Sequence, residues 1–458
     1  MALPRSPAHR IASAPPGAFD GEVLVGGDEV ERFRTDRSGY SPEGSPEAVV
    51  RARTVADVQR AVVHAREHRW TVVPRGAGTG LAGGAAAGAG SLVVDVSGLD
   101  RILEISADEA IAVVEPGVIT ARLDAAAEER GLRYAPDPAS AAISTIGGNI
   151  ATNAGGLRCV KYGVTGDAVL GLDVVLADGS LLHTGRRTVK GVAGLDLTSL
   201  FTGAEGTLGV IVGATLRLQP IPRKTITVAG WFDDVEQAAT AVSAALAARV
   251  RPSLLELLDE PSVRRAEEHL GVGGARPGAF VVAQTDGFGA AEEAEVLADA
   301  FRLVTSRVRV GSDPHVAEEL LAVRRAALPA LETLGRPFIE DIALPRTRIA
   351  EATRRIATIA EHHDIPIFVF GHAGDGNLHP IIVAPSETRE VLVRAEAAAD
   401  EIFALALEFG GSITGEHGIG VLKRRWLARE LGEDALRVQR SIRQALDPQG
   451  LFNRGKVW

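Results

Sequence analysis

Short apolar runs separated by glycine-rich turns dominate roughly the first 220 residues of the chain. Runs of this kind, bounded by turn residues, are typical of β-strands. They predict strands within residues 70–74, 91–97, 110–117, 170–180 and 206–220. Apolar residues at helical spacing predict one amphipathic helix, over residues 54–68, ahead of the first of these strands.

The pattern changes after the proline-containing segment 218–224, which we interpret as a domain boundary. Strands and helices then alternate, and Asp234 is a suitable N-terminal cap for the first helix. The predicted elements are strands at 225–232, 253–259 and 279–287 and helices at 234–249 and 290–305. The order β-α-β-β-α-β favours an antiparallel sheet with helices on one face. A helix at 346–363 leads into a hairpin at 368–383, and two final helices enclose residues 411–420.

A chain of 458 residues is too long for a single hydrophobic core, so two or three domains are expected. We predict an α+β protein with an N-terminal tail, a β-rich domain, a second domain built on the antiparallel sheet, and a C-terminal segment. Their ranges are 1–39, 40–222, 223–410 and 411–458. The tail is predicted to be flexible because prolines stand where a signal peptide needs an apolar run.

Charge and cysteine content exclude several classes of protein. The net charge of −10 argues against a nucleic-acid partner, because phosphate binding needs a basic surface. The single cysteine, Cys159, excludes an internal disulfide and a cysteine-rich zinc site, which fits a reducing cytosol. No stretch approaches the ~20 apolar residues that span a bilayer, so a membrane link would run through a partner protein.

A glycine-rich segment at residues 76–90 is the first candidate binding loop. Gly78, Gly80 and Gly83 fit the pattern G-x-G-x-x-G, but a strand rather than a helix is predicted to follow. A dinucleotide-binding fold needs that helix, so this reading is weak. Backbone N–H groups of such a loop can still hold phosphates.

A second glycine-rich loop spans residues 144–163 and offers polar side chains. These are Thr145, Asn149, Thr152 and Asn153. Two such loops in one β-rich domain favour a nucleotide site, although a pair of tight turns would give the same pattern.

The predicted hairpin carries two histidines that the strand period brings together. With "AGDG" as the turn, His372 lies opposite Asn377 and Phe370 lies opposite His379. Residues two apart on a strand share a face, so all four side chains should lie together. The histidines are then diagonal neighbours at ~7–8 Å, close enough to bind one ion. A slip of one residue would separate them.

The segment "GEHGIG" offers a third ligand, Glu416, and a further histidine, His417. Gly415, Gly418 and Gly420 allow the tight backbone turns that present these adjacent side chains. Two histidines and one carboxylate with open positions suit Zn²⁺, Mn²⁺ or Fe²⁺. A histidine pair on a polar hairpin without a metal is the alternative.

Five motifs in this order resemble those of the vanillyl-alcohol-oxidase-type FAD flavoproteins: "PRGAGTGLAGGA", "STIGGNIATNAGG", "GAEGTLGVI", "GHAGDGNLHP" and "GEHGIG". The chain is most similar to the branch of D-lactate dehydrogenases, D-2-hydroxyglutarate dehydrogenases and the D subunit of glycolate oxidase. The resemblance runs from about Tyr40 to the C-terminus. It implies a PCMH-type FAD-binding domain, a ferredoxin-like FAD-linked oxidase C-terminal (cap) domain, and a final segment that returns to the flavin.

The resemblance also implies roles for individual residues. His372, His379 and Glu416 match the metal ligands, with Zn or Mn expected, and His417 matches the catalytic base. The expected FAD contacts are Pro74, Arg75, Gly76, Ala77, Gly78, Thr79, Gly80, Leu81, Gly83, Gly84, Pro136, Asp137, Thr145, Gly148, Asn149, Thr152, Gly156, Tyr162, Glu205, Gly206, Ile211 and Asn453. Many relatives tether FAD to a histidine in the first loop, but no histidine lies between His68 and His183, so we predict non-covalent FAD.

Arg324 matches the position at which related enzymes hold the substrate carboxylate, and Arg325 beside it is expected to point elsewhere. Asn377 is the second predicted substrate ligand. The hydroxyglutarate enzymes carry threonine and lysine where this chain has Leu328 and Ile339, which favours D-lactate, glycolate or another short apolar 2-hydroxy acid.

The resulting hypothesis is an FAD- and metal-dependent enzyme that oxidises a D-2-hydroxy acid to the 2-oxo acid. The alternatives are a D-2-hydroxyglutarate dehydrogenase, a non-catalytic flavoprotein subunit of a glycolate-oxidase-like complex, and a metal-free alcohol oxidase. The expected partner is an electron acceptor: a cytochrome, a quinone, an electron-transfer flavoprotein or an iron–sulfur subunit. The oligomeric state stays open, with a homodimer as one option.

Overall fold

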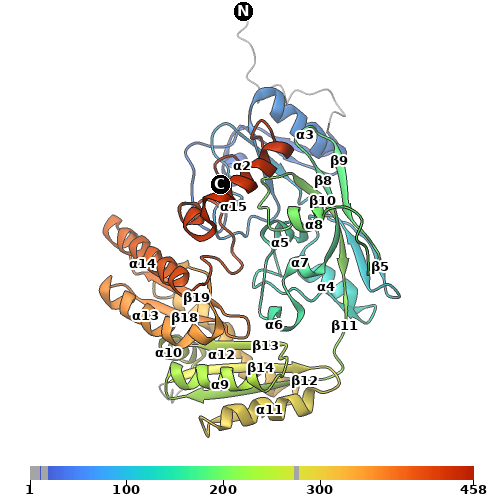
Figure 1. Ribbon diagram of the computed structural model, residues 1–458. Coiled ribbons are helices and arrows are strands. Elements are labelled where there is room, and N and C mark those ends of the chain that lie inside the picture. The colour runs from blue at the N-terminus through green and yellow to red at the C-terminus, as the bar shows by residue number, and fades with distance from the viewer. Residues whose placement is uncertain (1–10, 12–18, 273–277) are drawn as a thin grey trace, which may run out of the picture. The chain divides into compact units, whose positions relative to one another are not determined.

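The computed structural model describes residue 11, residues 19–272 and residues 278–458, and it divides into two compact units. The first unit comprises the described residues up to 155 together with residues 164–221 and 416–458. The second comprises residues 156–163 and 222–415. Figure 1 follows the chain by colour from blue to red, and the red C-terminal residues belong to the first unit. The excursion at 156–163 is not predicted by the sequence pattern.

Two larger sheets and one two-stranded pair form the described part of the first unit. One has the order β1-β2-β4-β3, with β2, β4 and β3 parallel, and the other is antiparallel with the order β5-β6-β10-β8-β9. The strands, including the β11-β7 pair, are β1 (Glu22–Leu24), β2 (Ala48–Arg51), β3 (Thr71–Arg75), β4 (Ser91–Asp95), β5 (Ile102–Ser106), β6 (Ile111–Val114), β7 (Leu132–Arg133), β8 (Val169–Val175), β9 (Leu181–Gly185), β10 (Val210–Arg217) and β11 (Gln219–Pro220). The helices are α2 (Asp28–Glu31), α3 (Val55–His68), α4 (Thr120–Glu128), α5 (Ile146–Thr152), α7 (Thr165–Ala168), α8 (Leu197–Phe201), η2 (Arg424–Trp426) and α15 (Leu427–Leu446).

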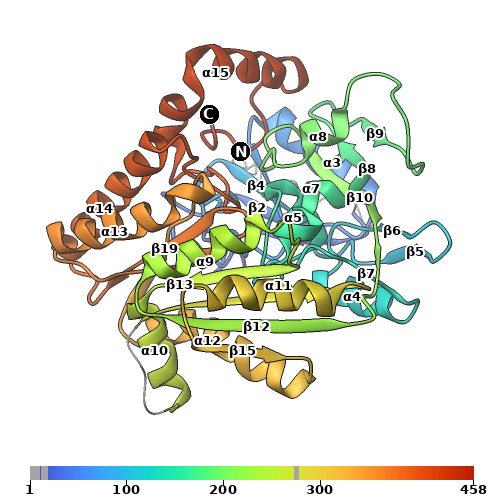
Figure 2. The same cartoon turned by 60° about the horizontal axis from the view of Figure 1, so that its bottom comes forward.

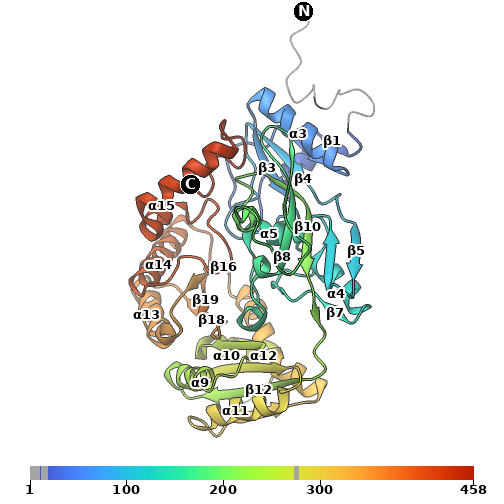
Figure 3. The same cartoon turned by 45° about the vertical axis from the view of Figure 1, so that its right-hand side comes forward.

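Helix α3 confirms the predicted amphipathic helix. Thr54 and Asp57 form a capping box, in which each side chain accepts a hydrogen bond from the other residue's N–H. Buried Val58, Ala61 and Ala65 form an apolar stripe on the helix. The helix contacts the parallel strands β2, β3 and β4, and Figure 3 shows it beside them. The helix therefore serves as the crossover between β2 and β3.

The predicted flexible tail over residues 1–39 is wrong for part of its length. Glu22–Leu24 pair with β2, and α2 follows. Val30 and Phe33 are buried in an apolar cluster with residues of β3 and β4, and this burial fixes the segment. Residues 1–10 and 12–18 of the predicted tail lie outside the described residues.

An eight-stranded antiparallel sheet forms the centre of the second unit, with the order β15-β12-β14-β13-β18-β19-β16 and β17 beside β19. Its strands are β12 (Thr225–Phe232), β13 (Leu254–Leu258), β14 (Ala279–Asp286), β15 (Val308–Gly311), β16 (Arg336–Ile339), β17 (Ile342–Ala343), β18 (Ile367–His372) and β19 (Asn377–Ala384). The helices are α6 (Cys159–Tyr162), α9 (Val235–Ala247), α10 (Glu260–Leu270), α11 (Ala290–Arg302), α12 (Pro314–Glu332), η1 (Arg346–Arg348), α13 (Ile349–His362) and α14 (Arg389–Glu408). The predicted cap on α9 is confirmed, since the Asp234 side chain accepts from the N–H of Gln237.

Helices cover both faces of this sheet. The two predicted helices, α9 and α11, lie together on one face as expected, and α10 and α12, which were not predicted, cover the other. Phe232 on β12 packs edge-on against Phe301 of α11. Ala229 points to the opposite face and joins an apolar cluster that contains residues of α10 and α12. Figures 1 and 3 show α9 and α11 on one side of the strands and α10 and α12 on the other. The sequence pattern does not predict α10, which lies between β13 and β14.

The hairpin β18–β19 belongs to the same sheet, beside β13. Figure 2 shows α13 and α14 side by side next to it, and α13 contacts β18 while α14 contacts β19. Phe370 on β18 and Ile381 on β19 point to the other face and enter the apolar cluster of α10 and α12. The face covered by α10 and α12, which we call the α12 face, therefore carries every second residue of the hairpin.

Candidate active site

The first glycine loop connects β3 to β4, which are parallel neighbours. Residues 76–90, all of which the structure describes, form no helix, so the expectation that a dinucleotide-binding helix is absent is confirmed. A parallel connection needs about a dozen residues or more, and here glycine-rich coil supplies them.

The two predicted glycine loops lie against each other in the first unit. A Cβ on Gly76 would overlap Oγ1 of Thr145, so only glycine permits this approach. Thr145 caps α5 by accepting from the N–H of Gly148 at 3.2 Å. Asn149 donates to Thr120 at the start of α4, and Thr152 donates to the carbonyl of Gly148 within the second loop. The adjacency of the loops fits a single nucleotide site.

Residues of the wrongly predicted tail hold the first glycine loop. The Arg37 N–H donates to the carbonyl of Gly78, and Asp36 accepts from the N–H of Ala85. Nη1 of Arg75 donates to the carbonyls of Phe33, Thr35 and Ala85. Arg75 is a predicted FAD contact. Its side chain holds the loop, and the residue is the last of β3 before the loop begins.

The C-terminal segment closes on this loop through Glu205, Asn453 and Lys456. The buried Glu205 carboxylate accepts from the N–H groups of Ile419 and Gly420, each at 2.8 Å. Asn453 Nδ2 donates to the carbonyl of Glu205 at 2.7 Å. Gly206 also lies here, because a Cβ on it would be 3.2 Å from Asn453 Nδ2. Three predicted FAD residues from distant parts of the chain are thereby brought together.

Lys456, which the sequence analysis did not select, is buried beneath the same loop. Its Nζ donates to the carbonyls of Gly84 (2.7 Å) and Ala86 (2.6 Å) and to Asn453 Oδ1 (3.0 Å). Burial lowers the pKa of Lys456 from 10.5 to about 7. The unfolded chain therefore holds this proton more tightly than the folded chain between those two pH values.

A Lys456→Met variant should reveal this proton. Between pH 7 and pH 10 the stability of the wild-type protein should rise relative to the variant, because only the wild type sheds a buried charge. The difference in free energy of unfolding should grow by a few kcal/mol at most, at about 1.4 kcal/mol per pKa unit. Thermal melts across this range test it, with the exposed Lys190→Met as control. A constant difference in Tm would contradict the prediction.

The remaining predicted FAD residues are distributed over both units. Pro136 and Asp137 follow β7, and Ile211 lies on β10 opposite Val174. Gly156 and Tyr162 belong to the second unit, where the Tyr162 hydroxyl donates to Asp286 at 2.7 Å. Cys159 also belongs there, and its Sγ accepts from the N–H of Gly156.

The hairpin register predicted from the sequence is confirmed. Phe370 pairs with His379 and His372 pairs with Asn377. All four side chains therefore lie on the α12 face. Both histidines are buried, with 5% and 6% of their surface exposed.

The two imidazoles point at each other through Nε2. The two Nε2 atoms are 3.4 Å apart, and the rings are nearly perpendicular. Two nitrogen ligands about 2.0–2.1 Å from a tetrahedral zinc ion are separated by about 3.3–3.4 Å. The pair is therefore already at the spacing that one cation requires.

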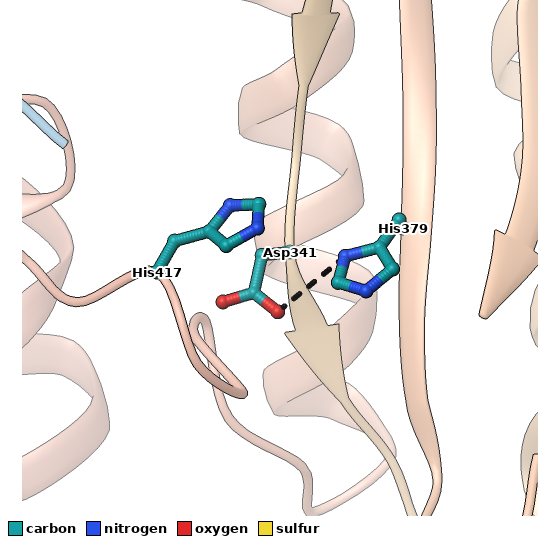
Figure 4. Close-up of side chains that lie close together, drawn as sticks. All are labelled: Asp341, His379 and His417. Atoms are coloured by element: carbon teal, nitrogen blue, oxygen red, sulfur yellow. Dashed lines mark ion pairs between the residues drawn. The ribbon is translucent and has the colours of Figure 1, made fainter. Parts of the chain in front are cut away.

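Each imidazole has a buried carboxylate on its Nδ1 side. Glu256 on β13 is the cross-strand partner of His372, and its Oε1 lies 2.7 Å from His372 Nδ1. Asp341 Oδ1 lies 3.8 Å from His379 Nδ1, the ion pair drawn in Figure 4. Neither carboxylate has measurable exposure. Neither residue was predicted from the sequence.

The ionisation of Glu256 fixes the state of His372. Burial by itself raises the pKa of Glu256, but the charges and hydrogen bonds of His372 and Arg324 lower it overall. An ionised carboxylate only accepts, so His372 donates from Nδ1, and Nε2 is left as the ring nitrogen that faces His379. Carboxylate–histidine pairs of this kind orient metal-binding imidazoles.

Arg324 reaches the same face from α12. Its Nε donates to Glu256 Oε2 at 2.8 Å, and its guanidinium lies over the Phe370 ring at 4.7 Å. Within the described residues its two terminal amino groups have no hydrogen-bond partner. Arg325 is exposed and pairs with Glu318, which confirms that it points elsewhere.

Glu416 and His417 begin the last segment of the first unit, directly after Gly415 ends the second. Asp341 Oδ2 fastens that end, since it accepts from Thr414 Oγ1 (2.7 Å) and from the N–H of Gly415 (2.8 Å). Glu416 therefore follows directly after a residue whose N–H the Asp341 carboxylate binds.

Glycine is required at position 415 because of Asn377. A Cβ on Gly415 would lie 2.5 Å from the amide carbon and nitrogen of Asn377. Gly418 and Gly420 have positive φ values of 85° and 50°, as the predicted tight turns require. Asn377 Oδ1 is buried and accepts no hydrogen bond from the described residues, so it can serve a bound ligand.

Comparison with known proteins gives a family match for the N-terminal part of the chain and another for the C-terminal part. Residues 46–185 match the family model described as an FAD binding domain, and residues 221–457 match the C-terminal domain of FAD linked oxidases. The chain is 39% identical to the glycolate oxidase subunit GlcD of Bacillus subtilis (strain 168), over 91% of this chain and 90% of that protein. It is 33% identical to a D-lactate dehydrogenase of Anaerostipes hadrus, over 95% and 94%.

Solved structures agree at the level of the fold. The structure of p-cresol methylhydroxylase superposes with a TM-score of 0.77 over 95% of this chain and 93% of that one, at 18% identity. A 4-ethylphenol oxidase from Gulosibacter chungangensis gives a TM-score of 0.76 over 95% and 94%.

The fold and the matched domains define an FAD-dependent oxidoreductase of the PCMH-type architecture. More specifically, the chain belongs to the FAD-linked oxidase family whose members include the glycolate oxidase subunit GlcD and D-lactate dehydrogenases. Among the described residues, no helix is long and apolar enough to cross a bilayer.

Proposed function

We propose that this flavoprotein oxidises a D-2-hydroxy acid to the corresponding 2-oxo acid with the help of a divalent cation. The observation that carries the proposal is the convergence of His372 Nε2 and His379 Nε2 at 3.4 Å. Two neutral imidazoles cannot aim their lone pairs at one another across this distance unless a proton or a cation lies between them. The names of the relatives, a glycolate oxidase subunit and a D-lactate dehydrogenase, support a hydroxy acid substrate.

Each group of residues in the site has its own role in the proposed reaction. His372, His379 and Glu416 would hold the cation, Zn or Mn, and the glycine loops would hold FAD without a covalent bond. The cation, when bound, makes the substrate hydroxyl more acidic, and FAD, when bound, accepts the hydride from C2. His417 takes the hydroxyl proton. The terminal amino groups of Arg324 bind the substrate carboxylate, a task that suits a planar guanidinium.

The surroundings of Arg324 favour a short apolar substrate. Leu328 lies one helical turn after Arg324 on α12, and Ile339 pairs with Ile381, two residues from His379. Both pack against the apolar cluster of the α12 face. Neither of these two described side chains offers a cation to a second substrate carboxylate, so we favour D-lactate or glycolate over D-2-hydroxyglutarate.

Anaerobic reduction of the flavin tests the function. D-lactate or glycolate should bleach the bound FAD, and prior removal of the metal with a chelator should abolish the bleaching. Bleaching that persists after treatment with the chelator would support a metal-free oxidase instead. No bleaching with a broad panel of 2-hydroxy acids would support a non-catalytic subunit.

Substrate choice gives a separate prediction. A Leu328→Thr/Ile339→Lys double variant should raise kcat/KM for D-2-hydroxyglutarate relative to D-lactate by about 10- to 100-fold, because a charged hydrogen bond contributes about 1.5–3 kcal/mol. Leu328→Val/Ile339→Val, which changes size without adding polarity, is the matched control. A wild-type enzyme that already prefers D-2-hydroxyglutarate would contradict the assignment of these residues.

A further inference from the structure

The carboxylate of Glu256 contacts two residues to which the proposed function gives different tasks. Its Oε1 lies 2.7 Å from Nδ1 of His372, a proposed metal ligand. Its Oε2 accepts from Nε of Arg324, the proposed substrate arm, at 2.8 Å. One carboxylate therefore links a proposed metal ligand to the proposed substrate-binding arginine.

The bridge is rigid. Glu256 is fully buried, and it lies directly across the β13–β18 ladder from His372. Arg324 is held on two sides, by Glu256 at Nε and by the ring of Phe370 beneath its plane. Phe370 precedes His372 by two residues on β18 and shares its face. A shift of Arg324 would therefore displace the carboxylate that orients His372, and the reverse also holds.

We propose that Glu256 is a positioning residue that couples the metal ligand His372 to the substrate arm Arg324. The inference rests on the proposed function and adds to it that the affinity for the cation and the affinity for the substrate both depend on Glu256. Linkage between two binding events is reciprocal, so a bound cation strengthens substrate binding and a bound substrate strengthens cation binding through this residue.

Glu256→Gln tests the coupling because it preserves shape while removing charge. A glutamine has one accepting oxygen, so it can accept a hydrogen bond from His372 Nδ1 or from Arg324 Nε, but not from both. Zn²⁺ affinity of the metal-stripped flavoprotein, measured against a chromophoric chelator, should fall about 10- to 100-fold. At saturating Zn²⁺, KM for D-lactate should still be raised about 10-fold, since Arg324 loses a charged hydrogen bond.

Two comparison variants separate the roles. Arg324→Met should raise KM for D-lactate and should also lower Zn²⁺ affinity, but by a smaller factor than Glu256→Gln does, because Glu256 keeps its contact with His372. Glu115→Gln, which removes a buried carboxylate paired with Arg101 in the first unit, should change neither affinity. If Glu256→Gln does not fold, Glu256→Gln/Arg324→Met lacks the uncompensated buried charge and can carry the Zn²⁺ measurement.

The outcomes distinguish this inference from the proposed function. A Glu256→Gln enzyme that loses only Zn²⁺ affinity, only substrate affinity, or only thermal stability overturns the coupling and leaves the function intact. A wild-type protein that binds no Zn²⁺ and does not oxidise D-lactate overturns both. The loss of both affinities in Glu256→Gln, with a smaller loss of Zn²⁺ affinity in Arg324→Met, supports both, whereas an unchanged Zn²⁺ affinity in Arg324→Met overturns the coupling.

Discussion

Replacing Glu416 by glutamine is expected to abolish turnover while FAD stays bound. The proposed site has two neutral histidine ligands, so Glu416 supplies the only negative charge among the three ligands. Glutamine keeps the size but loses that charge, and a divalent cation would then bind much more weakly. Because the cation contributes several kcal/mol to the reaction, kcat/KM for D-lactate should fall about 10³-fold or more.

Three measurements on Glu416→Gln decide the matter. The flavin absorbance should remain, the metal content should fall, and acid denaturation should still release the FAD into solution. Glu433→Gln, an exposed glutamate on α15, is the matched control and should behave as the wild type. Full activity in Glu416→Gln would refute the metal assignment, whereas loss of FAD would place Glu416 in the flavin site.

Much of the fold could be predicted because its determinants are local. The cap at Thr54, the cap at Asp234 and the apolar runs of the strands act within a few residues of one another. The excursion at 156–163 could not be predicted in this way. It is held by Lys161 and Tyr162, which contact Asp286 more than 120 residues away. Such a pairing leaves no periodic signal in the sequence.

The histidine pair was predictable for the same reason, since a short turn fixes the register of a hairpin. The carboxylates behind the histidines depend on strand pairing between distant segments. Glu256 meets His372 only because β13 lies beside β18, 116 residues further along the chain. One local signal did exist: Glu256 is the single charged residue in the buried strand "LLELL". A charge in such a strand needs a partner, and here it has two.

Replacing His417 by asparagine should give the complementary result to Glu416→Gln. If His417 is the base, the variant keeps the cation and FAD but loses the acceptor for the hydroxyl proton. Flavin reduction by D-lactate should slow about 10²- to 10⁴-fold, with little change in KM, because general base catalysis contributes on that scale. Added imidazole should restore part of the rate. His315→Asn, an exposed histidine at the start of α12, should leave the rate unchanged. A variant that instead loses the metal would make His417 a ligand. Loss of a base lowers the rate of flavin reduction but leaves the metal content unchanged, whereas loss of a ligand lowers both.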